Sequence, residues 1–131
     1  MKYHSVTTHH RTELINITGW IRSEVQKSGI QEGICVVFVP HTTAAVTINE
    51  SADPAVVEDL ISHLDKAVPK SNYYRHSEGN SDSHIKASLF GSSETLLISD
   101  GDLVLGTWQG VFFCEFDGPR TRKVFLTFVA S

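Results

Sequence analysis

Three stretches of the chain carry apolar residues at helical spacing. Between Pro54 and Pro69 they recur every three or four positions, which is the pattern of an amphipathic helix. Its apolar stripe consists of Val57, Leu60, Ile61, Leu64 and Val68. Asp53 is suited to cap this helix because its carboxylate can accept from the first free backbone amides. Two shorter helices are predicted over residues 20–28, capped by Thr18, and from about residue 83 to Gly91.

Apolar runs between these helices predict strands. Residues 5–18 are rich in Thr, Val and Ile without Gly or Pro, which favours one long strand. Residues 33–40 are continuously apolar between Gly33 and Pro40, which is typical of a strand covered on both faces. Further strands are predicted over residues 45–49, 94–99, 103–105, 111–116 and 123–129, with residues 117–120 as the hairpin turn between the last two.

Six or seven strands and about three helices in mixed order predict an α+β fold. The chain has 131 residues, of which 40% are apolar, so we expect a single domain that spans residues 1–131. In that domain the helices pack against a mixed, mostly antiparallel β-sheet or sandwich.

Composition limits the kinds of binding partner and the cellular compartment that we expect for this protein. The formal net charge is −4 and no basic run is present, which argues against a protein that binds nucleic acid through phosphates. No apolar segment reaches the ~18 residues of a membrane helix, and the N-terminus lacks the apolar core of a signal peptide. Cys35 and Cys114 each lie in an apolar run, so we interpret them as reduced core residues of a cytoplasmic protein.

Two of the seven histidines flank a polar loop that leads into the third helix. The segment reads RHSEGNSDSHIKASL over residues 75–89 and contains His76 and His84. A loop this polar cannot pack a core, so the histidines are candidate site residues, although an ordinary solvated loop is the alternative. Ser81 or Asp82 is suited to cap the helix. His84 then lies in the first turn, where the helix dipole disfavours the imidazolium and keeps the ring neutral.

His41 is expected at the carboxyl end of the strand before it, where a rigid scaffold presents functional groups. Three neutral imidazoles with an open position form catalytic zinc sites. His41, His76 and His84 therefore predict a site for a divalent metal, with zinc as the candidate, although their spacing matches no zinc motif. Glu50 and Asp82 are the nearby carboxylates, and either is suited to orient a ligating histidine or to act as a general base.

Donors for an anionic ligand accompany these residues. Gly79 and Asn80 offer amide donors, and Arg120 offers a fixed positive charge with a bidentate geometry. Gln109, which lies between Gly106 and Gly110, is a further candidate for substrate binding. We interpret its neighbour Trp108 as a core or interface residue. This set suits a phosphorylated small molecule. The remaining histidines carry no such pattern, and His63 falls off the apolar stripe of its helix.

Three segments together closely resemble the YjbQ-type family, also called secondary thiamine-phosphate synthases. They read PHTTAAVTINE, RHSEGNSDSHIKASLFG and LVLGTWQGVFFCEFDGPRTRKV, and the resemblance runs along essentially the whole chain. The motifs of this resemblance include His41, which lies in the PHTTA segment, and Arg120, which lies in the DGPR segment. The loop motif contributes His76, Asn80, Asp82 and His84.

The resemblance implies a homotrimer with histidine-rich sites near subunit boundaries, which hold a metal in some members. It also implies a weak thiamine-phosphate synthase activity, which joins hydroxymethylpyrimidine diphosphate to thiazole phosphate and releases pyrophosphate. Two alternatives stay open: a metal-dependent hydrolase of a phosphorylated or ester substrate, and a non-enzymatic trimeric protein that binds a metabolite.

Overall fold

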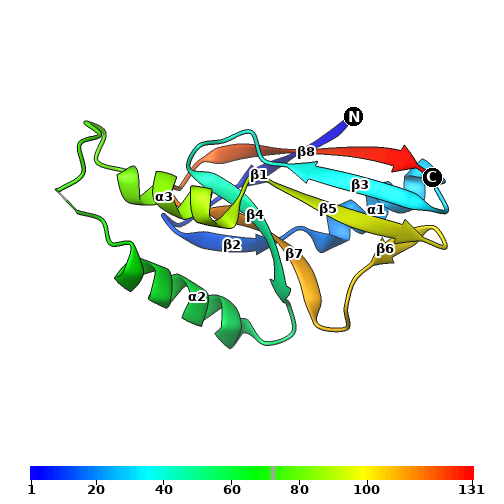
Figure 1. Cartoon of the computed structure of the whole chain (residues 1–131), viewed down its shortest axis with the longest axis horizontal. Helices are drawn as coiled ribbons and strands as arrows, with labels where there is room; N and C mark the ends of the chain where they lie inside the picture. The colour runs from blue at the N-terminus through cyan, green and yellow to red at the C-terminus, as the bar shows by residue number, and fades with distance from the viewer. Residues whose placement is uncertain (72) are drawn as a thin grey trace.

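Two antiparallel sheets form the centre of the molecule in the computed structural model, which describes residues 1–71 and 73–131 (Figure 1). The five-stranded sheet has the order β1-β8-β3-β5-β6, and the three-stranded sheet has the order β2-β7-β4. Their strands are β1 (Lys2–Thr7), β2 (Glu13–Asn16), β3 (Gly33–Phe38), β4 (Ala44–Glu50), β5 (Ser93–Ser99), β6 (Asp102–Val104), β7 (Gln109–Glu115) and β8 (Thr121–Ala130). With three helices, this arrangement confirms the predicted α+β class.

The helices begin and end close to their sequence signals. They are α1 (Thr18–Ser28), α2 (Pro54–Ala67) and α3 (Ser81–Phe90). Asp53 caps α2, because its Oδ1 accepts from the Ala55 amide at 2.9 Å. Gly29 follows α1 and Gly91 follows α3, both at positive φ. Thr18 does not cap α1 as predicted; its hydroxyl accepts from the Val111 amide at 2.8 Å and ties the helix to β7.

The main core lies between the two sheets and α1, and a smaller cluster lies under α3. The main core includes Ile21, Val25, Cys35, Val37, Val46, Val111, Phe113, Val124 and Leu126, and the smaller cluster contains Ala45, Ala87, Phe112, Cys114 and Phe116. The expectation that both cysteines are buried core residues is confirmed. Burial raises the pKa of the Cys35 thiol to about 11.

Two chain corners differ from the predicted strands. Residues 5–18 do not form one strand: β1 joins the five-stranded sheet and β2 joins the three-stranded sheet. The break is held by Thr8, which is buried, donates its hydroxyl to Glu115 and accepts from the Arg120 amide at 2.8 Å. Likewise, residues 117–120 form no hairpin, because β7 and β8 belong to different sheets and these residues carry the chain between them.

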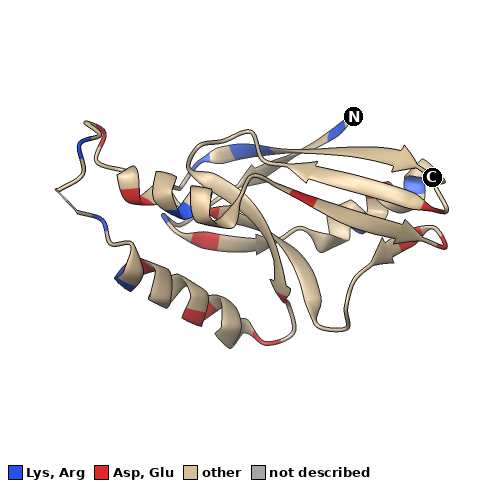
Figure 2. Ribbon diagram, viewed as in Figure 1, with Lys and Arg blue, Asp and Glu red and all other residues tan. Residues whose placement is uncertain are grey.

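The outer face of the five-stranded sheet is open in the single chain. Phe38 on β3 is 44% exposed, so this strand is not covered on both faces as predicted. Its apolar neighbours on this face include Tyr3, Leu97, Val104 and Val129, which are all exposed. None of the described helices is long and apolar enough to span a membrane. The basic residues lie on several elements, among them β1, β8, α1 and α2, rather than on one (Figure 2).

Candidate functional site

A cleft lies where the start of α3 meets the corner that links β7 to β8. Its volume is about 300 Å³, and its lining residues are all polar and come from three stretches of the chain. They are Thr42, Thr43, His76, Glu78, Asn80, His84, Asp117, Arg120 and Arg122, and we call this space the basic cleft. Both predicted loop histidines, Asn80 and Arg120 therefore line one space. His76, Asn80 and His84 all precede Asp117 of this corner by at least 33 residues in the sequence, and the hydrogen bond from Asn80 to Asp117 joins residues 37 positions apart.

His76 and His84 face each other at this cleft. Their ring centroids are 5.2 Å apart in an edge-to-face arrangement. His84 lies in the first turn of α3, and His76 lies in the loop before it. Gly79, at a φ of 74°, turns that loop back, and its amide donates to the His76 carbonyl at 3.2 Å. The turn therefore occupies the Gly79 amide, which is not the anion donor that the sequence predicts.

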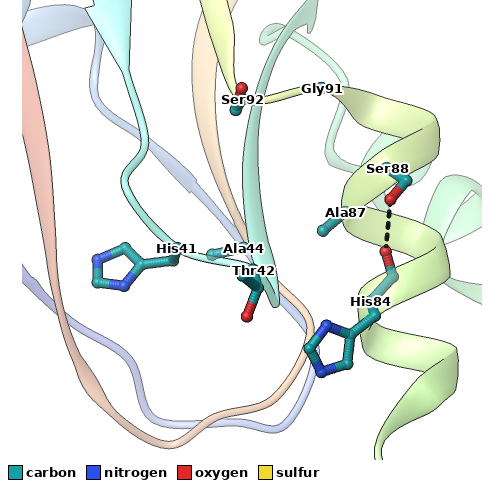
Figure 3. Close-up of a pocket in the computed structure, with 8 residues that line it drawn as sticks. All are labelled: His41, Thr42, Ala44, His84, Ala87, Ser88, Gly91 and Ser92. Atoms are coloured by element: carbon teal, nitrogen blue, oxygen red, sulfur yellow. Dashed lines mark hydrogen bonds between the residues drawn. The ribbon is translucent and has the colours of Figure 1, made fainter.

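His41 is used differently. Its Nε2 accepts from the Lys123 backbone amide at 2.9 Å, and its ring points away from His84 (Figure 3). Burial lowers the pKa of His41, and the charge of Arg122 lowers it further, so the ring is held neutral as an acceptor. The bond ties the link between β3 and β4 to β8. His41 is therefore a structural residue here.

The three predicted metal ligands thus do not converge. Within residues 1–71 and 73–131, no group of three His, Cys, Asp or Glu side chains is arranged to hold a metal ion. His76 and His84 supply two imidazoles, one fewer than the three protein ligands that catalytic zinc usually takes. We derive no chemical step through a metal, and divalent metal binding at this pair stays a prediction.

A second cavity adjoins the basic cleft at His84 and Thr42, which line both. Its volume is about 450 Å³. Beyond those two residues and His41, it is lined by Ala44, Ala87, Ser88, Gly91 and Ser92 (Figure 3). We call it the small-residue cavity. Ser88 donates its hydroxyl to the His84 carbonyl at 3.0 Å, which keeps this hydroxyl on the surface of α3 one turn after His84.

Asp117 organises one wall of the basic cleft. It accepts from Asn80 Nδ2 at 2.8 Å and from Arg120 Nη2 at 3.0 Å, and its carbonyl accepts from Arg120 Nε at 2.8 Å. Burial alone would raise the pKa of Asp117, but the bonds from Asn80 and Arg120 outweigh it and lower the pKa. The other amide atom, Asn80 Oδ1, is buried and has no hydrogen-bond partner among the described residues. A buried acceptor without a partner costs free energy, so this atom is suited to a donor from a ligand or water.

Arg122 is a cleft residue that the sequence analysis missed. It is buried with Glu115, to which it donates from Nε at 2.9 Å and also from Nη2, and its Nη2 donates to Thr43 Oγ1 at 2.8 Å. Burial alone would raise the pKa of Glu115, but the bonds from Arg122, the Asp117 amide and Thr8 lower it. The available signal was a glutamate inside the apolar run of residues 111–116, because a buried charge needs a partner.

Asp82 does not have either of its predicted roles. It is 0% exposed, and Arg11 binds both of its oxygens at 3.0 Å, with Lys86 Nζ at 3.4 Å. Burial alone would raise its pKa, but the bond and charge of Arg11 outweigh it and lower the pKa. The α3 N-cap is Asn80, and no side chain caps the helix. Asp82 therefore forms ion pairs with Arg11 and Lys86 inside the fold and is not available as a base for a substrate.

Glu50 and Gln109 lie away from the histidines. They pair with each other across β4 and β7. Glu50 is six residues along β4 from Ala44, where the strand lies nearest the basic cleft, so the two positions are about 20 Å apart. Gln109 Oε1 accepts from the Gly106 amide at 2.8 Å and closes its own turn. Trp108 beside it is 62% exposed, so it is not a core residue of this chain. We therefore do not assign Glu50 or Gln109 to the basic cleft.

Known proteins are similar to this chain over nearly its whole length. The model of the UPF0047 protein YjbQ-like family matches residues 2–131. A UPF0047 protein of Methanocaldococcus jannaschii is 50% identical over 128 residues, which cover 98% of this chain and 93% of that protein. The UPF0047 protein YugU of Bacillus subtilis is 43% identical over 127 residues, which cover 96% of each.

Solved structures give the same result. The crystal structure of a YjbQ/UPF0047 family protein from Clostridium acetobutylicum superposes with a TM-score of 0.97 at 51% identity, covering 98% of this chain and 100% of that chain. A YbjQ-like protein from Sulfolobus solfataricus superposes with a TM-score of 0.95 at 33% identity, covering 99% of this chain and 96% of that chain. The chain therefore belongs to the YjbQ-like UPF0047 family.

Proposed function

We propose that this chain is a transferase similar to the secondary thiamine-phosphate synthases, and that the basic cleft binds its phosphorylated substrates. The reaction joins hydroxymethylpyrimidine diphosphate to thiazole phosphate and releases pyrophosphate. The observation that carries the proposal is the gathering of two arginines and two histidines, Arg120, Arg122, His76 and His84, around one cavity of about 300 Å³. The Asn80 oxygen, which has no partner within the described residues, lies beside them. Guanidinium and imidazole donors are the groups that phosphate oxygens favour.

The chemistry makes few demands on acid–base residues. The bond between the pyrimidine methylene carbon and the diphosphate oxygen breaks, and pyrophosphate leaves with the electron pair. The thiazole nitrogen then forms its bond to that carbon with its own lone pair. No proton must move in either step, so the burial of Asp82 is compatible with the reaction. Catalysis consists of placing the two substrates and stabilising the charge on the leaving group.

Donor geometry, rather than net charge, favours phosphate in the cleft. Arg120 is paired with Asp117 and Arg122 with Glu115, so each guanidinium is close to neutralised within the protein. Each guanidinium nevertheless has five N–H donors in a fixed plane, and its protein partners do not occupy all of them. The carboxylates hold these planes in place, which reduces the entropy that a bound phosphate would otherwise cost.

We also propose that the chain assembles as a homotrimer through the outer face of the five-stranded sheet. A nearly uniformly apolar hollow of about 390 Å³ lies there, lined by Met1, Val36, Phe38, Phe125, Leu126 and Thr127. Exposed apolar surface of this kind marks contact sites between proteins. Light scattering should give a mass of three times 14.5 kDa. Phe38→Asp should lower that mass while Tyr73→Asp, at an exposed loop residue, should not; a monomeric wild type would contradict the proposal.

Release of pyrophosphate tests the activity. The wild type is incubated with the diphosphate and the thiazole phosphate, and pyrophosphate and thiamine phosphate are both measured. Arg120→Gln should lower the rate by about 10²-fold, the usual effect of removing one donor from a developing negative charge. Arg22→Gln is the matched control, because Arg22 is also a partly exposed arginine paired with one aspartate, Asp102, on another part of the fold.

Other outcomes identify the alternatives. If the wild type forms no thiamine phosphate, the transferase proposal is wrong. Turnover of simple phosphoesters that a chelator abolishes would identify a metal-dependent hydrolase at the His76–His84 pair. Tight binding of phosphorylated molecules without turnover would identify a binding protein.

A further inference from the structure

His84 and Thr42 stand at the boundary between the basic cleft and the small-residue cavity. Both residues line both spaces, so the two spaces meet at one point. Figure 3 shows Thr42, from the link between β3 and β4, facing His84 on α3. A ligand that is held in one space and longer than that space would therefore pass between these two side chains.

The two spaces differ in chemistry. The basic cleft presents arginine and histidine donors, two carboxylates and the Asn80 oxygen, which has no partner in the part of the chain that the structure describes. The small-residue cavity has no arginine or lysine in its lining and is walled by Ala87 and Gly91 with the hydroxyls of Ser88 and Ser92. At Gly91 an added Cβ would meet no atom within 4 Å, so the wall there is open. Small side chains leave room for a group of the ligand, and the hydroxyls offer hydrogen bonds to it.

We infer that one ligand spans both spaces: its phosphate lies in the basic cleft and its compact organic group lies in the small-residue cavity. The substrate class is thus an organic phosphate or diphosphate rather than inorganic phosphate or a polyphosphate. His84 and Thr42 contact the ligand where its phosphate joins its organic group. This inference rests on the proposed function, because it takes the basic cleft as the phosphate site.

The position of Ser88 makes the inference testable. Ser88 lies on the exposed side of α3 and lines only the small-residue cavity, so a larger side chain there fills the space of the organic group and leaves the basic cleft intact. Ser62 on α2 is also an exposed serine within a helix, and it lines neither space. Ser62→Phe is therefore the matched control for Ser88→Phe.

The experiment compares two probes by calorimetry on the full chain. Pyrophosphate reports the basic cleft, and phenyl phosphate reports both spaces. In Ser88→Phe, phenyl phosphate should bind about tenfold or more weakly while the pyrophosphate affinity stays within about twofold, and Ser62→Phe should change neither. Ser92→Phe, at a second lining residue that lies beyond the end of α3, should repeat the result and guards against a folding defect of the first variant.

Each remaining outcome is decisive. If both probes bind Ser88→Phe as they bind the wild type, the organic group does not lie in the small-residue cavity and the inference is overturned while the proposed function stands. If both probes weaken equally in Ser88→Phe and Ser92→Phe, the two spaces are not separate subsites, which also overturns it. If the wild type binds neither probe, the proposed function fails together with the inference.

Discussion

Asp82→Asn is the change that most directly tests how this fold holds its buried charges. The carboxylate is 0% exposed and joins Arg11, through two bonds of 3.0 Å, to Lys86 at 3.4 Å. Lys86 is also buried and has one further partner, Asp65 on α2, at 2.9 Å. The variant keeps the size of the side chain but leaves two positive charges facing a neutral amide.

The expected cost follows from these partners. Removing one member of a buried ion pair commonly costs about 3–5 kcal/mol, because the remaining charge stays buried without compensation. Here Asp65 still neutralises Lys86, and Arg11 is one-third exposed, so we expect the lower end, about 3 kcal/mol. For a chain of this length, that corresponds to a fall of about 10 °C in Tm.

Chemical denaturation of the wild type and Asp82→Asn measures this difference in the free energy of unfolding. Both proteins are kept at the same concentration, because any association between chains would couple to unfolding. Asp65→Asn is the control: it removes an exposed partner of the same lysine and should cost less than about 1 kcal/mol. A loss below about 1 kcal/mol for Asp82→Asn would refute the reasoning. Pyrophosphate release by the folded variant should stay near that of the wild type, because Asp82 does not line the basic cleft.

The pH dependence has a defined sign. The pKa of Asp82 is lower in the folded than in the unfolded state, so its ionisation stabilises the fold at pH values above the unfolded pKa of about 4. That contribution is lost as the pH falls toward the folded pKa. The free-energy difference between wild type and Asp82→Asn should therefore be largest near neutral pH and should shrink in acid. A difference that grows below pH 4 would contradict the assignment.

Two further predictions follow from the site and the core. Elemental analysis should find that His76→Ala and His84→Ala lower the content of any bound zinc, while His41→Ala leaves it unchanged. His41→Ala should lower the free energy of unfolding by about 1 kcal/mol, the value of its one backbone hydrogen bond. Equal loss of zinc in all three variants would place His41 in the metal site. Because burial raises the pKa of Cys35 to about 11 and also raises that of Cys114, neither thiol should react with a disulfide reagent at pH 8 until denaturant is added. Rapid labelling of the native protein would contradict their burial.

Local signals in the sequence determined most of the helices and strands. Asp53 and Pro54 define the start of α2, and Gly29 and Gly91 define the ends of α1 and α3, because each acts through the backbone of its immediate neighbours. The sequence also identified His76, His84, Asn80 and Arg120 as cleft residues, since polar side chains in a turn-rich segment have no core to pack.

Tertiary structure decided which strands share a sheet and which charges meet. No local pattern assigns β1 and β2, or β7 and β8, to different sheets, because the corners between them depend on Thr8 and Glu115, which lie 107 residues apart. The pairing of Asp82 with Arg11 spans 71 residues, and that of His41 with the Lys123 amide spans 82. The periodicity of the sequence indicates which face of a helix or strand is apolar. The role of a polar side chain depends instead on the partner that the fold brings to it, and in these pairs the partner lies far away in the sequence.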